Sequence, residues 1–450
     1  FDYSEAYGVP VLFRPTTRVC HSYASVELLE RLPQKQPEGF VKDSKWVIFP
    51  RLSYTNHIKI EEQLDAMSGD FSRYENNRLT GRGRKGIATG GVSYAYVCEA
   101  LGTAAPADCK LLKIATVPFP QPLGLDFLRG LDEVLVVEEL DPVIEKELIH
   151  LCGRHHLNVD IKGKLTGDLQ RAGEYTVDGV SMAVRGFLGY GRHPVPVPAL
   201  PPLPVRPPVL CAGCPHRASF FAVKQATKGI PAVFSGDIGC YTLGNALPLD
   251  MVDTCLCMGA GITIAQGLHR VEPDRVHFAF VGDSTFFHTG LPGIINAVYN
   301  RSDLIVVILD NSTTAMTGNQ PHPGLGRTMM GDLADPVSIE RVVSSLNVSK
   351  IIRANPFDVN AAKEALRSVL GETGVRVLLF EAPCISLSTG KTAYTVDPSV
   401  CTGCGVCVRT LGCPAIHMDA GKAMIQPALC TGCGICADVC KIGAIGGEAL

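Results

Sequence analysis

Charged residues are scarce in this sequence, and no long uncharged apolar segment is present. Asp, Glu, Lys and Arg make up 19% of its 450 residues, against roughly 25% in typical soluble chains, and hydrophobic residues make up 46%, which excludes disorder. The longest uncharged stretch, residues 284–300, contains His288, Pro292 and two asparagines, which excludes a membrane span. The formal net charge of −3 gives no electrostatic reason to expect nucleic acid as a partner.

A targeting signal and an initiator methionine are also missing from the start of the sequence. Phe1 is followed by neither the basic region nor the apolar region of a secretory signal peptide. We therefore predict a soluble cytoplasmic protein. Because Phe1 stands where a methionine is expected, we also predict that an N-terminal portion of a longer subunit precedes this opening.

Cysteine, in contrast, is abundant and unevenly placed. Of 18 cysteines, eight lie between residues 401 and 440, in two C-x₂-C-x₂-C repeats that are each followed by one further cysteine. This clustering indicates metal ligation in a reducing compartment. In two-cluster proteins the fourth thiolate of each cluster comes from the other repeat. The predicted ligand sets of two [4Fe-4S] clusters are Cys401, Cys404, Cys407 and Cys440, and Cys413, Cys430, Cys433 and Cys436.

A pair of zinc sites is the alternative to two iron–sulfur clusters. Zinc sites use two cysteine pairs, which leaves the third cysteine of each repeat without a role. The repeats differ from those of bacterial two-cluster ferredoxins at two places. Five residues separate Cys407 from Cys413, and Lys441 replaces the proline that follows the last ligand. Both changes leave all eight ligands in place.

Two compositional breaks divide the rest of the chain. Residues 78–86 are rich in glycine and arginine, which predicts an exposed loop between domains; the alternative is a docking patch for phosphates or for an acidic protein. Residues 191–208 contain eight prolines, which predicts an extended polyproline-II linker. Between the breaks, strands at residues 109–117 and 133–138 alternate with helices, so we expect a small parallel sheet.

After the second break, short apolar runs alternate with helical segments. Strands are predicted at residues 232–235, 276–281, 304–309 and 375–380, and helices at residues 259–269, 291–299 and 359–370. Each apolar run is typical of a strand that is buried on both faces. The predicted fold class is α/β, with doubly wound parallel sheets followed by a ferredoxin-like α+β module that contains the cysteine repeats. Ligands of such sheets bind at loops that follow the carboxyl ends of the strands.

Polar residues follow two of these strands, where ligands are expected. Gly282, Asp283 and Ser284 directly follow one strand, and Asn311 follows the next strand about two dozen residues later. A carboxylate and an amide oxygen suit a Mg²⁺ ion whose other positions go to diphosphate oxygens, and the backbone carbonyl of Thr313 adds a third protein ligand. The spacing is similar to the motif of thiamine-diphosphate enzymes. We therefore predict a site for thiamine diphosphate and Mg²⁺ at these strand ends.

Further residues are predicted to line this site. Gly236, Asp237 and Gly239 follow another strand, and the two glycines allow the backbone to approach a cofactor. His288 lies a few residues beyond the turn at Gly282. It faces the reacting centre as a catalytic residue in one interpretation, and only caps or packs on the next helix in the other.

Four cysteines outside the repeats lie on loops beside the predicted cofactor, namely Cys211, Cys214, Cys240 and Cys384. They are the ligands of a third [4Fe-4S] cluster in one interpretation. In the other they are buried thiols, because free cysteine packs as a small hydrophobic residue. Cys255 and Cys257 lie in an apolar region that is predicted to be helical, and they are assigned to the core.

Thiamine-diphosphate and ferredoxin motifs in one chain resemble the 2-oxoacid:ferredoxin oxidoreductases, and within that family the alpha subunits of indolepyruvate:ferredoxin oxidoreductase. The segments that carry the resemblance are CAGCPHR from Cys211 to Arg217, GDIGCYTLG from Gly236 to Gly244, GDSTFFH from Gly282 to His288, and ILDNSTTAMTG from Ile308 to Gly318. The spacing C-x₂-C-x₂-C-x₅-C-P, which ends at Pro414, is a variant of this family. The opening from Gly8 to His21 is similar to the end of its pyrimidine-binding domain, so the resemblance covers essentially the whole chain.

The resemblance implies a division of the chain into six segments. They are the end of a truncated pyrimidine-binding domain (1–25), a connector (26–85), an α/β domain like the C-terminal domain of transketolase (86–192), the proline-rich linker (193–209), the domain that binds the diphosphate and Mg²⁺ (210–395) and the ferredoxin domain (396–450). The glutamate that activates the aminopyrimidine ring in this family matches no residue here, so the resemblance places it before this opening.

The resemblance also implies the reaction, which is oxidative decarboxylation of an aryl 2-oxo acid such as indole-3-pyruvate. The implied partners are a beta subunit, ferredoxin, coenzyme A and the 2-oxo acid, without nucleic acid or membrane. The alternatives are a pyruvate-type relative and a non-oxidative thiamine-dependent decarboxylase, which would need no clusters. An electron-transfer iron–sulfur protein is an alternative of another class, but it would need no pair of Asp283 and Asn311.

Overall fold

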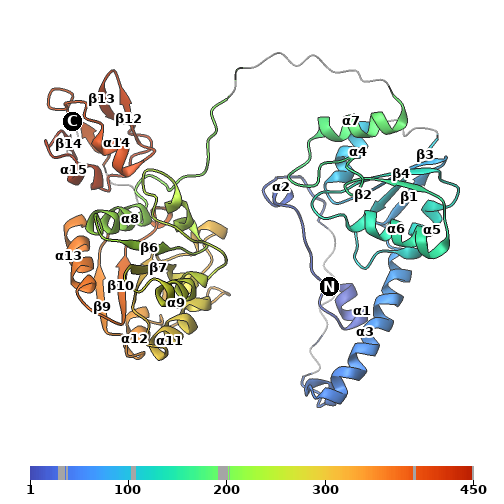
Figure 1. Ribbon diagram of the computed structural model, residues 1–450, viewed down its shortest axis with the longest axis horizontal. Helices are drawn as coiled ribbons and strands as arrows, with labels where there is room; N and C mark the ends of the chain where they lie inside the picture. The colour runs from blue at the N-terminus through green and yellow to red at the C-terminus, as the bar shows by residue number, and fades with distance from the viewer. Residues whose placement is uncertain are drawn as a thin grey trace. The chain divides into compact units, whose positions relative to one another are not determined.

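The computed structural model describes residues 1–28, 36, 39–102, 108–190, 201, 203–388 and 392–447. The chain divides into two units, Phe1–Leu200 and Pro201–Leu450, and each contains its own β-sheet (Figure 1). Most of the predicted proline-rich linker lies outside the described residues. Within the described part of the chain, no helix is long and apolar enough to cross a membrane.

A five-stranded sheet with the order β1-β3-β2-β4-β5 forms the core of the first unit. Its strands are β1 (Arg78–Gly81), β2 (Lys85–Gly90), β3 (Cys109–Ile114), β4 (Glu133–Val137) and β5 (Asp160–Lys162). β1 is antiparallel to β3, and the other pairs are parallel. Two helices pack on each face, with α5 (Gln121–Leu128) and α6 (Val143–His155) on one and α4 (Ser93–Leu101) and α7 (Val177–Leu188) on the other. The short helices α1 (Asp2–Tyr7) and α2 (Thr17–Cys20) precede the long helix α3 (Pro50–Phe71), which contacts α5.

The prediction of an exposed loop at residues 78–86 is wrong, because this segment contributes to two strands of the sheet. Its first half is the antiparallel edge strand β1, and Lys85 begins the central strand β2. Gly86 packs closely against Phe127 of α5 and against Leu131, which follows α5. A Cβ added to Gly86 would lie 2.6 Å from both side chains. Glycine is therefore required in this buried strand, which shortens the apolar run that would have marked it in the sequence.

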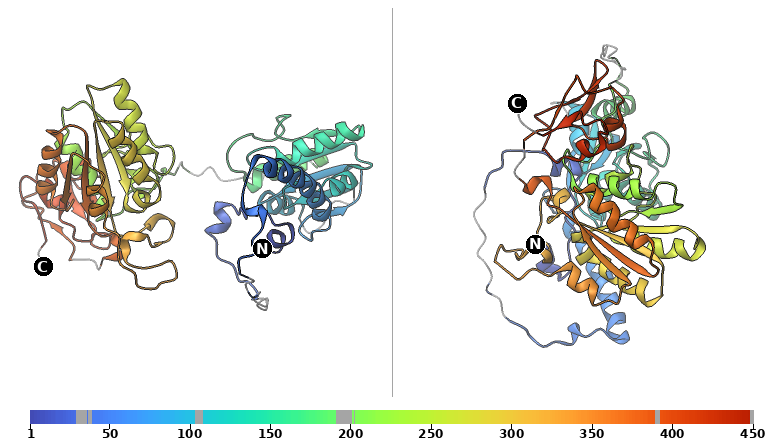
Figure 2. Two further views of the ribbon diagram at one scale, coloured as in Figure 1. Left: turned by 90° about the horizontal axis from the view of Figure 1, so that it is seen from below. Right: turned by 90° about the vertical axis from the view of Figure 1, so that its left-hand side faces the viewer.

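The second unit contains a fully parallel five-stranded sheet with the order β6-β7-β8-β10-β9. Its strands are β6 (Ala232–Ser235), β7 (Val276–Gly282), β8 (Leu304–Asp310), β9 (Lys350–Ala354) and β10 (Val375–Glu381). One face is covered by α8 (Pro215–Ala226) and α13 (Val359–Leu370), and the other by α9 (Ala260–Val271), α11 (Leu291–Tyr299) and α12 (Ile339–Ser344). Figure 2 shows these layers from two further directions. The predicted doubly wound parallel-sheet fold is confirmed.

A small module follows this sheet in the chain. Its elements are two short helices, α14 (Val406–Leu411) and α15 (Ile435–Val439), and two antiparallel strand pairs, β11 (Thr395–Val396) with β14 (Ile445–Gly446) and β12 (Ile416–Asp419) with β13 (Lys422–Ile425). Each helix begins after a glycine with positive φ, Gly405 or Gly434, that follows the second cysteine of its repeat. The apolar side chains of the module share one buried cluster with α8 and α13. The predicted α+β module is therefore confirmed, and it packs on the second sheet domain.

Candidate functional site

The carboxyl ends of neighbouring parallel strands meet at one edge of the second sheet. Residues that were predicted to bind the cofactor follow these strands, namely Gly236 and Asp237 after β6, Asp283 after β7 and Asn311 after β8. The register pairs Gly282 with Leu309, which brings Asp283 next to Asp310 and Asn311. The sheet thus assembles at one edge residues that lie about 75 positions apart in the sequence.

Asp283 is a buried carboxylate with one unsatisfied oxygen. The residue is 2% exposed, and its Oδ1 accepts a hydrogen bond of 2.7 Å from the backbone N–H of Ser284. Its Oδ2 lies 3.1 Å from Nε2 of His322, yet neither of these buried atoms has a hydrogen-bond partner among the described residues. A buried carboxylate oxygen that accepts no hydrogen bond is costly, so these surroundings fit an added cation.

Asp310 adds a second carboxyl group beside Asp283. Burial raises the pKa of Asp310 to about 6, and the neighbouring charge of Asp283 acts in the same direction. Buried side chains of Asn311 and Thr313 complete the oxygen-rich surroundings. Oxygen groups of this kind are the ligands that a hard divalent cation such as Mg²⁺ prefers. The residues present therefore fit the predicted ion, and they include Asp310, for which no role was predicted.

Asp237 holds the loops around the site through both of its carboxylate oxygens. Oδ1 accepts a hydrogen bond of 2.6 Å from the N–H of Gly259, at the start of α9, and Oδ2 accepts one of 2.9 Å from the hydroxyl of Tyr241. That hydroxyl also lies 3.1 Å from Oγ1 of Thr285. The ring of Tyr241 lies so close to Gly282 that an added Cβ would be 2.6 Å from it. Asp237 therefore positions the loops after β6 and β7, and Gly282 is required by the packing of Tyr241.

The other residues that were predicted to bind the cofactor lie on the same edge. Gly239 also contacts the ring of Tyr241, where an added Cβ would lie 2.6 Å from the ring. The hydroxyl of Ser284 forms a hydrogen bond with the hydroxyl of Thr314, which connects the loops after β7 and β8. Direct contact of these residues with a cofactor stays a prediction.

His216 lies at the start of α8 and reaches the same edge, although no role was predicted for it. Its buried ring packs edge-on against Tyr241, with the ring centroids 5.4 Å apart. Burial lowers the pKa of His216 to about 4, although the charge of Asp283 acts in the opposite direction. The imidazole is therefore neutral at neutral pH. Its place directly after the pair Cys211 and Cys214 is the one local signal that could have pointed to it.

His288, the predicted catalytic histidine, lies in the π-helical segment η3 (Phe286–Gly290) that leads into α11. Single π-helical turns inside helices occur frequently at functional sites. The side chain is exposed, and its Nδ1 lies 3.4 Å from Oγ1 of Thr289. The catalytic role of His288 stays a prediction.

The four cysteines that were predicted to bind a third cluster come together beside this site. Burial raises the pKa of the Cys240 thiol, and the charges of Cys384 and Cys211 act in the same direction. Burial also raises the pKa of Cys214 to about 12, again with Cys211 as a contributor. The N–H of Cys384 donates a hydrogen bond of 2.8 Å to the carbonyl of Asn311. One cysteine of this set is thus joined directly to a predicted Mg²⁺ ligand.

The assignment of Cys255 and Cys257 to the core is wrong. Both residues lie in an irregular segment before α9, where Cys257 is exposed and Cys255 is half-buried. Helix α9 begins only after Gly259, whose φ of 86° is left-handed and stops a helix from extending backwards. Leu256, which lies between the two cysteines, is likewise at the surface, with 77% of its area exposed.

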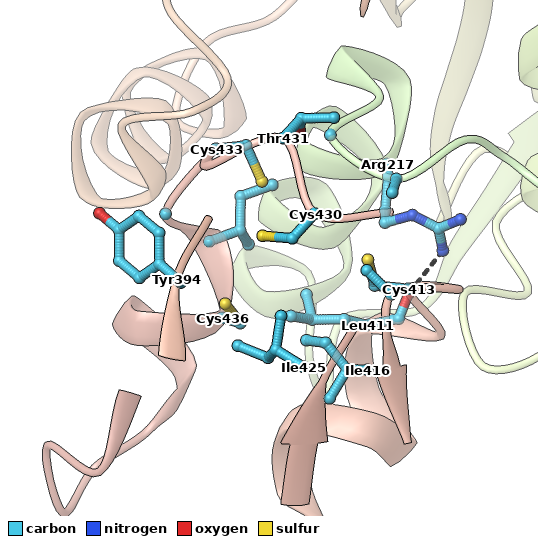
Figure 3. A pocket seen from close by; sticks show the side chains of 15 residues that line it. Arg217, Tyr394, Leu411, Cys413, Ile416, Ile425, Cys430, Thr431, Cys433 and Cys436 are labelled. Atoms are coloured by element: carbon cyan, nitrogen blue, oxygen red, sulfur yellow. Dashed lines mark hydrogen bonds between the residues drawn. The ribbon is translucent and has the colours of Figure 1, made fainter. Parts of the chain in front are cut away.

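One pocket of the C-terminal module is surrounded by a predicted ligand set. The cysteines that line it are Cys413, Cys430, Cys433 and Cys436. Figure 3 shows their sulfur atoms on the inner side of the pocket, beside the apolar side chains of Ile416 and Ile425. Burial raises the pKa of Cys436 to about 12, and the charges of Cys433 and Cys430 act in the same direction. The structure thus brings one cysteine of the first repeat to three of the second, as the spacing predicts.

The other predicted set is also drawn from both repeats. Burial raises the pKa of the Cys407 thiol, and the charges of Cys440 and Cys404 act in the same direction. Backbone N–H groups of Ala423 and Gly403 lower the pKa of Cys401. Within the described residues, no three His, Cys, Asp or Glu side chains converge closely enough to hold a single metal ion. A [4Fe-4S] cluster instead distributes its thiolates over separate iron atoms, and the number of clusters stays a prediction.

Comparison with known families and proteins adds independent information. A family model described as "Thiamine pyrophosphate enzyme, C-terminal TPP binding domain" matches residues 237–380, and one described as "4Fe-4S binding domain" matches residues 423–446. The first range contains Asp283 and Asn311, and the second contains four of the predicted cluster ligands.

Curated relatives match almost the whole chain. Indolepyruvate oxidoreductase subunit IorA of Methanothermobacter thermautotrophicus is 38% identical over 464 residues, which cover 99% of this chain and 74% of that protein. IorA of Pyrococcus horikoshii is 38% identical over 487 residues, with the same coverage of both chains. The 2-oxoglutarate synthase subunit KorB of Archaeoglobus fulgidus is 26% identical over 189 residues, which cover 40% of this chain and 70% of that protein. The chain therefore belongs to the family of indolepyruvate oxidoreductase alpha subunits, IorA.

Proposed function

We propose that the chain catalyses the ferredoxin-dependent oxidative decarboxylation of an aryl 2-oxo acid, with indole-3-pyruvate as the substrate. The 2-oxo acid and coenzyme A give an aryl-acetyl-CoA thioester, CO₂ and one proton, while two electrons reduce two ferredoxin molecules. The hydrogen bond from Cys384 to the carbonyl of Asn311 carries this proposal, because it supports an electron acceptor directly beside the thiamine site. A non-oxidative decarboxylase has no need of an acceptor there.

Thiamine diphosphate supplies the electron sink that takes up the electron pair when CO₂ leaves a 2-oxo acid. Asp283 and Asn311 would hold Mg²⁺ and, through it, the diphosphate, because they are buried oxygen groups at adjacent strand ends. Asp237 keeps the loops after β6 and β7 in place through its bonds to Gly259 and Tyr241. The buried ring of Tyr241 also keeps water away from this edge.

Partner proteins follow from the same proposal. The relatives are named as subunits, which supports a second subunit, the beta subunit, in the complete enzyme. The two predicted clusters of the C-terminal module form the electron exit, and ferredoxin takes the electrons from it.

The substrate is tested with the chain and its partner subunit together. Dye reduction would be followed with indolepyruvate, phenylpyruvate, pyruvate and 2-oxoglutarate, each with and without coenzyme A. We expect kcat/KM for the two aryl acids to exceed the others at least tenfold, because burial of an aromatic ring adds binding energy that a methyl group cannot supply. Preference for 2-oxoglutarate is the second candidate, which the similarity to KorB supports, and it would replace the aryl assignment. Release of CO₂ without an electron acceptor would contradict the oxidative reaction itself.

The third cluster is tested by iron content. With three [4Fe-4S] clusters the anaerobically purified chain should hold about twelve iron atoms. Replacing Cys240 and Cys384 together by alanine should lower this number to about eight, because two of four ligands are lost. The matched control replaces Cys255 and Cys257 by alanine and should leave the iron content unchanged, since Cys257 is exposed, Cys255 is half-buried and neither belongs to a predicted ligand set. An unaltered chain that holds only about eight iron atoms would show that the four cysteines are ordinary thiols.

A further inference from the structure

Arg217 is a buried cation outside the proposed decarboxylation chemistry. It lies in α8 and is only 4% exposed, and within the described residues no carboxylate forms an ion pair with it. A buried charge without an opposite charge nearby is strongly unfavourable, so an anionic group is expected beside this guanidinium.

Hydrogen bonds of Arg217 join the sheet domain to the C-terminal module. Its Nη1 donates to the backbone carbonyls of Leu411 and Gly412, at 2.7 and 2.9 Å, and its Nη2 donates to the carbonyl of Leu210. Leu411 and Gly412 directly precede Cys413, whereas Leu210 directly precedes Cys211. The planar guanidinium, with donors that point in several fixed directions, therefore ties together the two loops that lead into two cysteine sets.

The ionisable groups that interact with Arg217 are cysteine thiols from the same two sets. Burial lowers the pKa of Arg217, and the charges of Cys413, Cys214 and Cys211 act in the opposite direction. Arg217 also lines the pocket of Cys413, Cys430, Cys433 and Cys436, which we call the Cys413 set. Figure 3 shows Arg217 beside Cys413, with its bond to Leu411. The cation thus lies between the predicted third cluster and the cluster of Cys413, Cys430, Cys433 and Cys436.

Close packing brings the loops of the two cysteine sets into direct contact. Gly213 has a φ of 70°, and an added Cβ would lie 1.9 Å from Oγ1 of Thr431. Gly412 has a φ of 58°, and an added Cβ would lie 2.4 Å from Cδ of Pro248. Both contacts join the sheet domain to the module, so Arg217 lies in an interface that is fixed on either side of it.

We propose that Arg217 is a positioning residue for electron transfer, which fixes the loops of Cys211 and Cys413 against each other and raises the reduction potential of the cluster in the Cys413 set. This inference rests on the proposed function. A cluster with four thiolates carries a net negative charge, and its reduction adds one electron. A buried cation stabilises the more negative state, and solvent screens this effect little at a buried site. Arg217 therefore favours entry of electrons into the module.

The test is a reductive titration of the enzyme with its partner subunit, followed by EPR. The reduction step that belongs to the cluster of the Cys413 set would be identified as the one that disappears when Cys433 and Cys436 are both replaced by alanine. For Arg217→Gln, which keeps a hydrogen-bond donor but loses the charge, we expect the equilibrium constant for reducing this cluster to fall at least tenfold, a shift of about 59 mV to more negative potential. Arg217→Lys keeps the charge and should retain the potential of the unaltered protein.

Arg409→Gln is the matched control. The side chain of Arg409 also donates to a carbonyl next to a predicted ligand, that of Cys404 at 2.6 Å, but Arg409 is exposed, so solvent screens its charge. Its variant should leave all potentials unchanged. An unchanged potential in Arg217→Gln, with full iron content, would overturn the inference, whereas absence of clusters from the unaltered protein would overturn the proposed function. If Arg217→Gln loses its iron, the potential is compared in Arg217→Lys instead. A tenfold fall in the equilibrium constant for reducing the cluster in Arg217→Lys would then overturn the role of the charge.

Discussion

Replacing Asp283 by asparagine is expected to weaken binding of thiamine diphosphate at least a hundredfold, which is about 2.8 kcal/mol. The substitution keeps the size of the side chain but removes the charge that Mg²⁺ requires. Asp283 is buried, and its Oδ2 has no hydrogen-bond partner among the described residues, so the loss of its charge leaves Asp310, whose pKa burial raises, as the neighbouring carboxyl group. Binding would be measured by calorimetric titration of the cofactor-free protein with thiamine diphosphate in the presence of Mg²⁺.

Asp335→Asn is the control for this prediction. Asp335 is exposed and lies in the segment before α12, so its variant should bind the cofactor as the unaltered protein does. Both variants should keep the visible absorbance of the terminal clusters, because Asp283 lies at the sheet edge and not in the C-terminal module. Equal affinity in Asp283→Asn and the unaltered protein would contradict the assignment of Asp283 as a Mg²⁺ ligand.

The position of Asp283 and Asn311 could be predicted because parallel strands carry a strong signal. β7 and β8 are apolar over almost their whole length and are buried on both faces, so each strand and its polar end are visible in the sequence. The same reasoning places the carboxyl ends of these strands at one edge. Cys384, on the loop after β10, could be assigned to this edge for the same reason.

Other residues of the site could not be predicted, because long-range packing brings them there. His322 reaches Asp283 from an irregular segment, and no periodic pattern leads to it. Tyr241 looks like an ordinary aromatic residue until its hydroxyl is seen to bond with Asp237. Asp310 reads as the last residue of a strand, and its interaction with Asp283 depends on the register between β7 and β8.

Exceptions to the expected patterns explain the errors in the fold prediction. The central strand β2 contains glycine where Phe127 and Leu131 pack on it, so its sequence resembles a loop. The edge strand β9 carries Lys350 and Arg353, which interrupt its apolar run because an edge strand is only partly buried. In both strands, tertiary contacts decide the structure against the local pattern.

Replacing Cys433 and Cys436 together by alanine is expected to remove the whole cluster of the Cys413 set, with the loss of about four iron atoms per chain. Both residues line the pocket in Figure 3, and the two remaining thiolates cannot hold a cubane that needs four. Iron analysis and visible absorbance would measure the loss. Replacing Cys255 and Cys257 by alanine is the matched control, which should keep full iron content.

Electron transfer should respond more strongly than cofactor binding in this variant. The Cys413 set lies against the loop of Cys211 and Cys214 through Gly213 and Thr431, so we propose its cluster as the first acceptor in the module. Without it, we expect ferredoxin reduction to fall at least a hundredfold, while affinity for thiamine diphosphate, measured by calorimetry, stays unchanged. Ferredoxin reduction at the normal rate would mean that electrons bypass the Cys413 set. Because Arg217 bonds to Leu411 and Gly412 of the same pocket wall, such a bypass would also remove the reason for its buried charge.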